Sequence, residues 1–225
     1  MNFDCPINMP RSTHYGNSYY EVYSKKLKRI VRLFSSLEYA NFLTLEMHPS
    51  VKKFCEQPLE IEIMLEGKSK KAIFDFWVLY NDTSEEMQEV KYSQELNGTD
   101  EKSIRSQEQI RRQKKWCEEH NINHVVRTDK DIYVGQFFIK NLEYLAAKSR
   151  RYIPIDDNYY RPLILNTLRR SKKVSINDMI NLEILPARHE MDYISCLYYE
   201  GVIKMDLTTR PIDGKMEVTL WQPSR

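Results

Sequence analysis

The chain has 225 residues, of which 41% are apolar and 29% are charged, and its formal net charge is only +2. This length and composition predict one large domain, or one domain with a small appendage, and they exclude binding to nucleic acid through overall basicity. The four cysteines are scattered without a CxxC pair, which disfavours a zinc ribbon and a disulfide framework. We therefore expect reduced thiols in an intracellular protein. Neither a signal peptide nor a membrane-spanning run of ~18 apolar residues is apparent.

The first 150 residues have the pattern of an α/β domain. Residues 1–34 are polar, tyrosine-rich and basic, and predict extended structure. In residues 35–48 apolar side chains recur at three- and four-residue spacing, which predicts a helix. Further along the chain the pattern predicts strands over 59–65, 71–80, 87–92 and 123–128 and helices over 100–119 and 136–148, with the strand 71–80 buried on both faces. This order predicts a core built on one mixed sheet.

The pattern changes after residues 148–162, where charge runs and two prolines predict a linker. Three short helices are expected from "RPLILNTLRR", "SINDMINLE" and "ARHEMDYISCLYYEG". A hairpin is expected from "VIKMDL" and "MEVTLW", which flank the turn "PIDGK". Three helices and a hairpin within about 65 residues predict a small winged helix. We therefore expect two domains, residues 1–150 and residues 160–225.

Charged side chains are predicted to gather on one face of two neighbouring strands. Side chains alternate between the faces of a strand, so Glu89 and Lys91 share a face. A turn centred near Thr83 places Asp75 opposite Lys91 and diagonal to Glu89, and diagonal neighbours lie about 7–8 Å apart. A divalent cation can bridge two carboxylates at that distance, and the backbone carbonyl of Val90 is a further candidate ligand.

These residue types suit metal-dependent hydrolysis of a phosphodiester. Mg²⁺ prefers hard oxygen ligands, typically one or two carboxylates with substrate phosphate and water. Such an ion generates hydroxide and polarises phosphorus, and a nearby lysine orients the attacking water. The alternative is a structural ion pair between Asp75 and Lys91, with Glu89 on a solvated edge. The motif alone does not distinguish a catalytic metal site from a structural ion pair, because short motifs often match by chance.

Five separated segments resemble TnsA, the endonuclease subunit of the heteromeric cut-and-paste transposases. In chain order, within residues 11–145, they are "SSLEYANFLTLE", "FCEQPLEI", "IFDFW", "EVKYSQEL" and "HVVRTDKDI". The resemblance implies a restriction-endonuclease-like (PD-(D/E)xK) mixed-sheet fold for the catalytic domain, residues 1–150. It also implies a small winged-helix-like domain for partner docking over residues 160–225.

The resemblance also implies the site residues. The implied catalytic set is Glu38, Asp75, Glu89 and Lys91, and the implied ligands of Mg²⁺, for which Mn²⁺ is expected to substitute, are Glu38, Asp75, Glu89 and Val90. Position 89 is Glu here, where some members have Gln, and this adds negative charge to the metal site. Glu38 has an alternative role, because Ser35 precedes it at capping-box spacing and such a cap stabilises a helix by about 0.5–2 kcal/mol.

By resemblance, the protein is expected to be a Mg-dependent endodeoxyribonuclease that cuts the 5′ strands at transposon ends. A TnsB-type transposase would then process the 3′ strands, and a TnsC-type ATPase regulator would bind the C-terminal domain. The resemblance implies binding to transposon-end DNA, no association with a membrane, and a bacterial cytoplasmic location at the nucleoid when in complex.

The third expected helix of the C-terminal domain, residues 187–200, is a poor candidate for reading DNA. It carries Glu190, Asp192 and Glu200 beside Arg188 and His189, whereas a recognition helix needs a basic and polar outer face. We therefore expect this domain to bind protein more than DNA. Two other functions remain open: a stand-alone restriction- or repair-type nuclease of the same superfamily, and a non-enzymatic winged-helix DNA-binding regulator.

Overall fold

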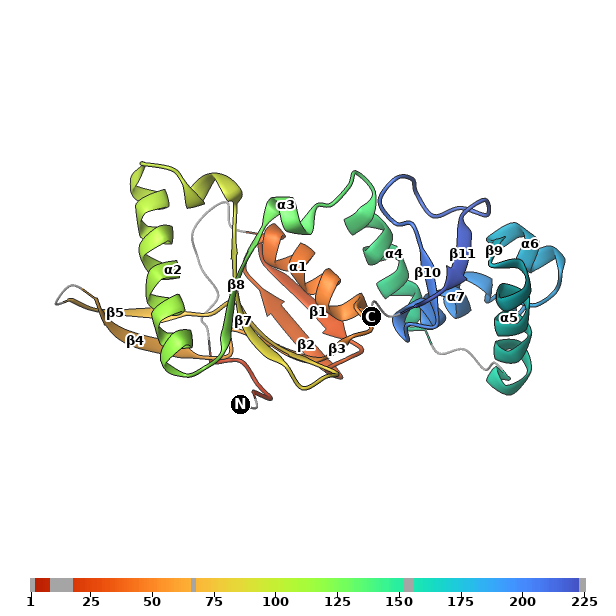
Figure 1. The fold of residues 1–225 in the computed structure, drawn as a ribbon, viewed down its shortest axis with the longest axis horizontal. Helices are drawn as coiled ribbons and strands as arrows, with labels where there is room; N and C mark the ends of the chain where they lie inside the picture. Colours follow the sequence, from red (N-terminus) through yellow and green to blue (C-terminus); the bar gives the residue numbers. More distant parts are fainter. Residues whose placement is uncertain (1–2, 9–17, 66–67, 152–155, 223–225) are drawn as a thin grey trace. The chain divides into compact units, whose positions relative to one another are not determined.

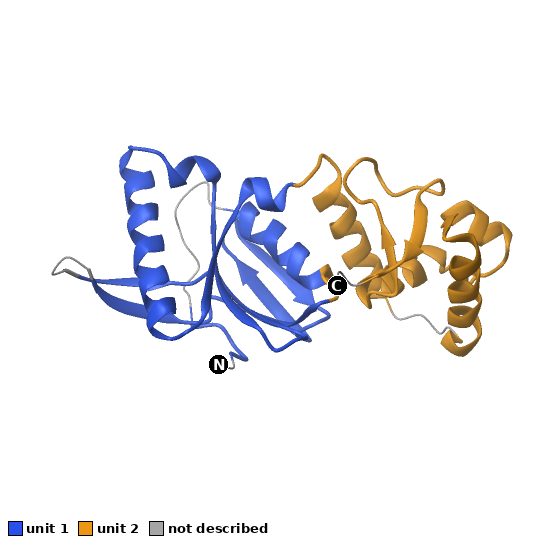
Figure 2. Cartoon of the chain, in the orientation of Figure 1, with its two compact units in different colours: residues 1–46, 50–133 blue, residues 47–49, 134–225 orange. Residues whose placement is uncertain are grey.

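The computed structural model describes residues 3–8, 18–65, 68–151 and 156–222. The chain divides into two compact units (Figure 2): residues 1–46 with 50–133, and residues 47–49 with 134–225. Each unit has its own sheet and its own helices (Figure 1). Within the described residues, no helix is both long enough and apolar enough to cross a lipid bilayer.

The first unit is built on a four-stranded mixed sheet. Its strands, in the order β3-β6-β7-β8, are β3 (Val51–Glu56), β6 (Phe76–Tyr80), β7 (Glu85–Lys91) and β8 (Asn123–Thr128). The first three are antiparallel, and β8 lies parallel to β7. Parallel neighbours need a long crossover, and here it contains the short 3₁₀ helix η1 (Ser93–Leu96) and α2 (Glu101–Glu119). The predicted mixed α/β architecture is therefore confirmed for this unit.

Different helices cover the two faces of this sheet. On one face Phe54 of β3 packs against Phe42 of α1 (Ser36–Met47), with ring centroids 5.8 Å apart. On the other face Trp77 and Met87 are buried in a cluster with Cys117 of α2. Because side chains alternate along a strand, the two helices account for burial on both faces. After β8 the chain forms a short helix, α3 (Asp129–Ile132), which the sequence analysis did not predict.

Two antiparallel hairpins accompany the main sheet. The first is β1 (Tyr20–Ser24) with β2 (Arg29–Leu33), within the basic segment that was expected to be extended. The second is β4 (Glu60–Leu65) with β5 (Lys68–Ile73). The prediction of one common sheet is wrong for the segment 59–65, because β4 pairs only with β5. Ile61, Ile63 and Ala72 of this hairpin are buried in the same cluster as Trp77.

The single strand predicted over residues 71–80 is in fact two strands, β5 and β6, which belong to different sheets. Phe74 and Trp77 are both buried in one cluster, although residues three apart on a continuous strand point to opposite faces. A break at Asp75 resolves this conflict. The predicted register was also wrong by two residues, since Trp77 pairs with Met87 and not with Glu89. A shift of two keeps every side chain on its predicted face, whereas a shift of one would reverse them all.

The second unit contains the three helices and the strand pair expected in the C-terminal region. They are α5 (Asp157–Ser171), α6 (Ile176–Asn181), α7 (Glu190–Tyr199), β10 (Ile203–Met205) and β11 (Glu217–Leu220). A short strand, β9 (Lys173–Ser175), was not predicted and completes an antiparallel sheet in the order β10-β11-β9. The linker predicted at 148–162 is wrong at its end, because α5 starts at Asp157; residues 152–155 lie outside the described part.

The boundary between the units lies earlier than the predicted division between residues 1–150 and 160–225. α4 (Phe138–Ser149) is part of the second unit, because it packs against α7. Its buried Asn141 donates hydrogen bonds to the backbone carbonyls of Leu207 (2.9 Å) and Arg210 (2.8 Å) and accepts one from the N–H of Ile212. These contacts tie α4 to the loop between β10 and β11.

We predict that a chain truncated at this boundary folds better than one truncated after α4. We expect a chain ending at Tyr133 to unfold cooperatively, whereas a chain ending at Tyr159 exposes Leu142 and Leu145 of α4, which are buried in the full chain. Exposing such a side chain costs about 1.5–3 kcal/mol, so the longer fragment should scatter more light and bind more of a hydrophobic dye. Thermal melts followed by circular dichroism, with light scattering, compare the two. A longer fragment that stays monomeric while the shorter one is unfolded would contradict the boundary.

Candidate active site

Asp75 lies at the break between β5 and β6 and is held from two directions. Its backbone carbonyl accepts a hydrogen bond from the N–H of Gln57 (2.9 Å), just after β3. Its Oδ2 accepts one from the backbone N–H of Val90 on β7 (2.7 Å). The side chain therefore points toward the strand that carries Glu89 and Lys91, as the sequence predicted. Val90 contributes its N–H to this contact, and the role of its carbonyl as a metal ligand stays a prediction.

Glu89 and Lys91 are neighbours on one face of β7. The Nζ of Lys91 lies 2.7 Å from Oε1 of Glu89, and the Glu89 side chain is 0% exposed. The alternative with Glu89 on a solvated edge is therefore wrong, and the close ion pair of Lys91 is with Glu89. The side chain of Lys91 keeps 19% of its area exposed, so the lysine lies at the border between the buried Glu89 and the solvent.

Two glutamines of α2 also contact Glu89, and the sequence analysis missed them. The Nε2 of Gln109 donates to Oε1 of Glu89 (2.8 Å), and the Nε2 of Gln113 donates to Oε2 (2.6 Å). Basic residues outnumber the glutamines along this helix, and the glutamines carry no charge that marks them as site residues. Glutamines four residues apart lie on one face of a helix, and that spacing was the available signal.

Glu38 takes part in a helix cap and also lies beside Asp75. In the first turn of α1 its N–H donates to Oγ of Ser35 (3.0 Å), and its carboxylate accepts from that hydroxyl and from the N–H of Phe34. The cap is therefore present. The same carboxylate lies close enough to Asp75 for the two negative charges to interact. Both residues line a hollow of about 370 Å³, whose lining is Phe34, Glu38, Gln57, Glu60, Lys71, Ala72, Ile73, Asp75 and Gln109.

Burial and mutual repulsion make these carboxylates hard to ionise. Burial, followed by the charge of Asp75, raises the pKa of Glu89 to about 8 and that of Glu38 to about 7. Burial also raises the pKa of Asp75, although Lys91 and the N–H of Val90 oppose the shift. Burial acts against the charge of Lys91, but Glu89 and Asp75 raise its pKa above the usual value. One lysine therefore faces three acidic groups, which leaves negative charge uncompensated when all are ionised.

The acidic side chains at this site are the candidate ligands of a divalent cation. In the described part of the chain, no three His, Cys, Asp or Glu side chains lie close enough together to hold a metal ion. What the fold brings together is the pair Asp75 and Glu89. Because Mg²⁺ usually takes only one or two carboxylates and keeps several waters, this pair fits the ion. The uncompensated negative charge also favours binding of a cation. The set with Glu38 as a third ligand stays a prediction.

The site thus consists of a half-buried aspartate, a buried glutamate and a lysine beside one strand break of a mixed sheet. Residues 48–129 match the family described as "TnsA-like endonuclease N terminal". The matched range includes Asp75, Glu89, Lys91 and both glutamines, whereas Glu38 precedes it. It covers less than half of the chain. The predicted resemblance to TnsA is confirmed for this range, which is similar to the N-terminal domain of TnsA-like endonucleases. Comparison with curated proteins gave no match.

The raised pKa values predict how stability depends on pH. The pKa of Glu89 is 4.5 ordinarily and about 8 in the folded protein, so the fold binds this proton more tightly than the unfolded chain does. Its stabilising contribution is complete below pH 4.5 and is lost as the pH rises through about 8. In EDTA we expect the thermal unfolding midpoint to fall as the pH rises from 4.5 to about 8. The variant Glu89→Gln should lose much of this pH dependence. Scanning calorimetry measures it.

The matched control for this measurement is Glu62→Gln, which removes an exposed glutamate of β4. This variant should keep the wild-type pH dependence. An equally steep fall in Glu89→Gln would contradict the electrostatic description of the site. Mg²⁺ should reduce the fall in the wild type, because the cation offsets the charge that appears as the protons leave.

Proposed function

We propose that this protein is a Mg²⁺-dependent DNA endonuclease of a transposition complex. The observation that carries the proposal is the convergence of Asp75, Glu89 and Lys91 within a TnsA-like endonuclease domain. We further propose that the domain is of the restriction-endonuclease (PD-(D/E)xK) type, with the aspartate before β6 and the Glu-x-Lys pair on β7 as its motif. The bound ion supplies polarisation of the phosphodiester and activation of water.

The chain's own groups have separate tasks in this proposal. Asp75 and Glu89 bind the cation, and the N–H of Val90 fixes the direction of Asp75. Lys91, held by Glu89, presents its ammonium group where the attacking water and the developing negative charge lie. Glu38 lines the hollow of about 370 Å³ together with Asp75, and its hydrogen bond with Ser35 fixes it at the start of α1. The hollow is where the scissile phosphate would enter.

The strand specificity and the partners are part of the proposal. The protein would cut the 5′ strands at the transposon ends, and a TnsB-type transposase would process the 3′ strands and recognise the end sequences. Two enzymes acting on opposite strands release the element completely. A stand-alone nuclease of the same superfamily would cut DNA without these partners. A non-enzymatic regulator would gain no stability from Mg²⁺ or Mn²⁺, so the two alternatives are readily separated.

Reconstituted cleavage tests this function. On labelled transposon ends with the partner proteins, Asp75→Asn should abolish cutting of the 5′ strand, because the amide removes a charged ligand. Lys91→Ala should slow it about 10²–10³-fold, as expected for loss of a group that stabilises transition-state charge. Both variants should retain 3′ cleavage. Lys115→Ala, which removes an exposed lysine of α2, is the control. Normal 5′ cleavage by Asp75→Asn would refute the assignment.

The second unit is proposed to be a winged-helix-like domain that binds a TnsC-type ATPase and not DNA. Most residues of α7 are buried, among them Tyr193, Ile194 and Leu197. One side of α7 is covered by α4, and Lys148 of α4 lies 3.5 Å from the carboxylate of Asp192. A helix that enters a major groove needs a free polar face, so this burial supports docking of a protein.

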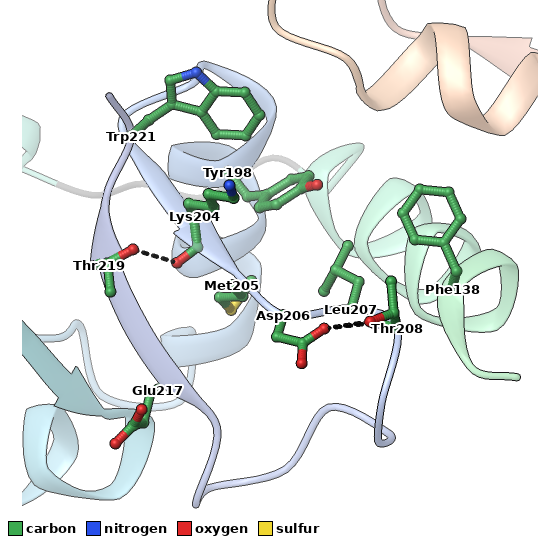
Figure 3. Close-up of a pocket in the computed structure, with 10 residues that line it drawn as sticks. All are labelled: Phe138, Tyr198, Lys204, Met205, Asp206, Leu207, Thr208, Glu217, Thr219 and Trp221. Atoms are coloured by element: carbon green, nitrogen blue, oxygen red, sulfur yellow. Dashed lines mark hydrogen bonds between the residues drawn. The ribbon is translucent and has the colours of Figure 1, made fainter. Parts of the chain in front are cut away.

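A hollow of about 580 Å³ in this unit offers a surface for such a partner (Figure 3). It is lined by aromatic and charged side chains together with smaller ones: Phe138, Tyr198, Lys204, Met205, Asp206, Leu207, Thr208, Glu217, Thr219 and Trp221. Trp and Tyr are enriched at the centres of protein interfaces, where their rings give large contact areas. We propose that the ATPase regulator contacts this hollow and that the ring of Trp221 lies at the centre of the interface.

Substitution of Trp221 tests the docking surface. Trp221→Ala in the full chain should weaken binding of the ATPase partner about tenfold or more, which is the size expected for an aromatic side chain at the centre of an interface. Metal binding by the first unit should not change. Tyr159→Ala removes an exposed aromatic ring of α5 outside the hollow and is the control. Biolayer interferometry gives both affinities, and an unchanged affinity for Trp221→Ala would exclude this hollow.

A further inference from the structure

The carboxylate of Glu89 accepts hydrogen bonds on both oxygens from neutral donors. Gln109 occupies Oε1 at 2.8 Å and Gln113 occupies Oε2 at 2.6 Å, while Lys91 also lies at Oε1. A carboxylate with both oxygens bonded cannot rotate without losing a bond. Its orientation is therefore set by α2, which lies outside the sheet that carries Glu89.

The side chain of Gln113 is oriented for this contact at a cost to stability. Gln113 is 0% exposed, and its Oε1 is buried without a hydrogen-bond partner among the described residues. A buried acceptor without a partner destabilises the fold. Turning the amide around would place that oxygen against the Glu89 carboxylate, where the two acceptors repel. The amide therefore keeps its N–H groups toward Glu89 at the expense of its own oxygen.

The same two amides also bond to the chain just before Asp75. The backbone carbonyl of Ile73 accepts from Nε2 of Gln113 (3.0 Å) and from Nε2 of Gln109 (3.4 Å). Ile73 ends β5, two residues before Asp75. Since β5 and β7 belong to different sheets, no ladder of hydrogen bonds joins them. The glutamines link the segment that carries Asp75 with the strand that carries Glu89.

We propose that Gln109 and Gln113 are positioning residues that hold Glu89, and the segment leading to Asp75, in the geometry that binds a divalent cation. The inference rests on the proposed metal-dependent function and deepens it. Amide donors suit the task because they direct a carboxylate without neutralising its charge. An arginine or lysine at these positions would compete with the cation. Partners of this kind around a metal ligand typically contribute 10–100-fold to metal affinity.

The test is titration of Mn²⁺ into the full chain in the absence of DNA, by isothermal titration calorimetry. Gln113→Met keeps the side-chain volume and removes the amide, and Gln109→Leu acts at a half-buried position. Both are expected to weaken Mn²⁺ binding about 10–100-fold. The control is Gln107→Leu, on the same helix, because Gln107 donates to the backbone carbonyls of Glu95 and Gly98 and not to a site carboxylate.

A double-mutant cycle separates positioning from general stability. In a Glu89→Gln background, Gln109→Leu should weaken Mn²⁺ binding no further, because the carboxylate that it positions is already gone. A merely structural glutamine would lower the thermal midpoint in both backgrounds and leave the affinity unchanged. If Gln113→Met does not fold, Gln109→Leu still decides.

The outcomes for this inference and for the proposed function are distinct. Wild-type Mn²⁺ affinity in Gln109→Leu, with weakened binding in Glu89→Gln, overturns the positioning role and leaves the metal site intact. No Mn²⁺ binding by the wild type, or binding that Asp75→Asn does not change, overturns the metal site itself and the positioning role with it. Weakened binding in both glutamine variants but not in Gln107→Leu supports the inference.

Discussion

The hydrogen bond from the backbone N–H of Val90 to Oδ2 of Asp75 is the contact on which the candidate site depends. The ladder between β6 and β7 ends at the pair Phe76–Gln88, so the chain facing Val90 has already left the sheet. A buried N–H needs an acceptor, and here a side chain takes the place of the missing backbone carbonyl. The break in the strand therefore both frees the N–H of Val90 and supplies the aspartate that satisfies it. A continuous strand would have left Asp75 as one more residue on a covered face.

The charges at this break are not balanced by the protein's own groups. The half-buried Asp75 and the buried Glu89 lie close together, and Lys91 alone does not compensate their charges, as the raised pKa of Glu89 indicates. Removing a charge from water is costly unless a partner or a metal ion compensates it. Perturbed acidic groups in a hollow are common at functional sites for this reason. The helix cap offsets part of the cost of placing a carboxylate here, because Glu38 lines the site and also stabilises the start of α1.

The sequence predicted what depends on local pattern, and failed where distant packing decides. The spacing of apolar residues located α1 and α2, and alternation placed Asp75, Glu89 and Lys91 on one side. Alternation could not reveal the break at Asp75, because "KAIFDFWVLY" is apolar enough to read as one buried strand. The conflict appears only when Phe74 and Trp77 are known to share a cluster. The sequence analysis missed the glutamines of α2 for a related reason. They contact β5 and β7, which are distant in the sequence, and the residue pattern within the helix does not predict these contacts. The roles of the site residues themselves are still predictions.

The position of α4 determines which side of α7 is accessible in the second unit. As part of the second unit, α4 covers α7 and pairs Lys148 with Asp192, so the helix that could read DNA in a winged helix is built into the interior. Exposing α7 would break that ion pair and uncover the apolar side chains between the two helices, which is a large cost for a small unit. In the proposed nuclease, contact with DNA therefore falls to the first unit, where Glu38, Asp75 and Lys71 are among the residues that line the hollow. On the same proposal, recognition of the transposon-end sequence falls to a partner protein.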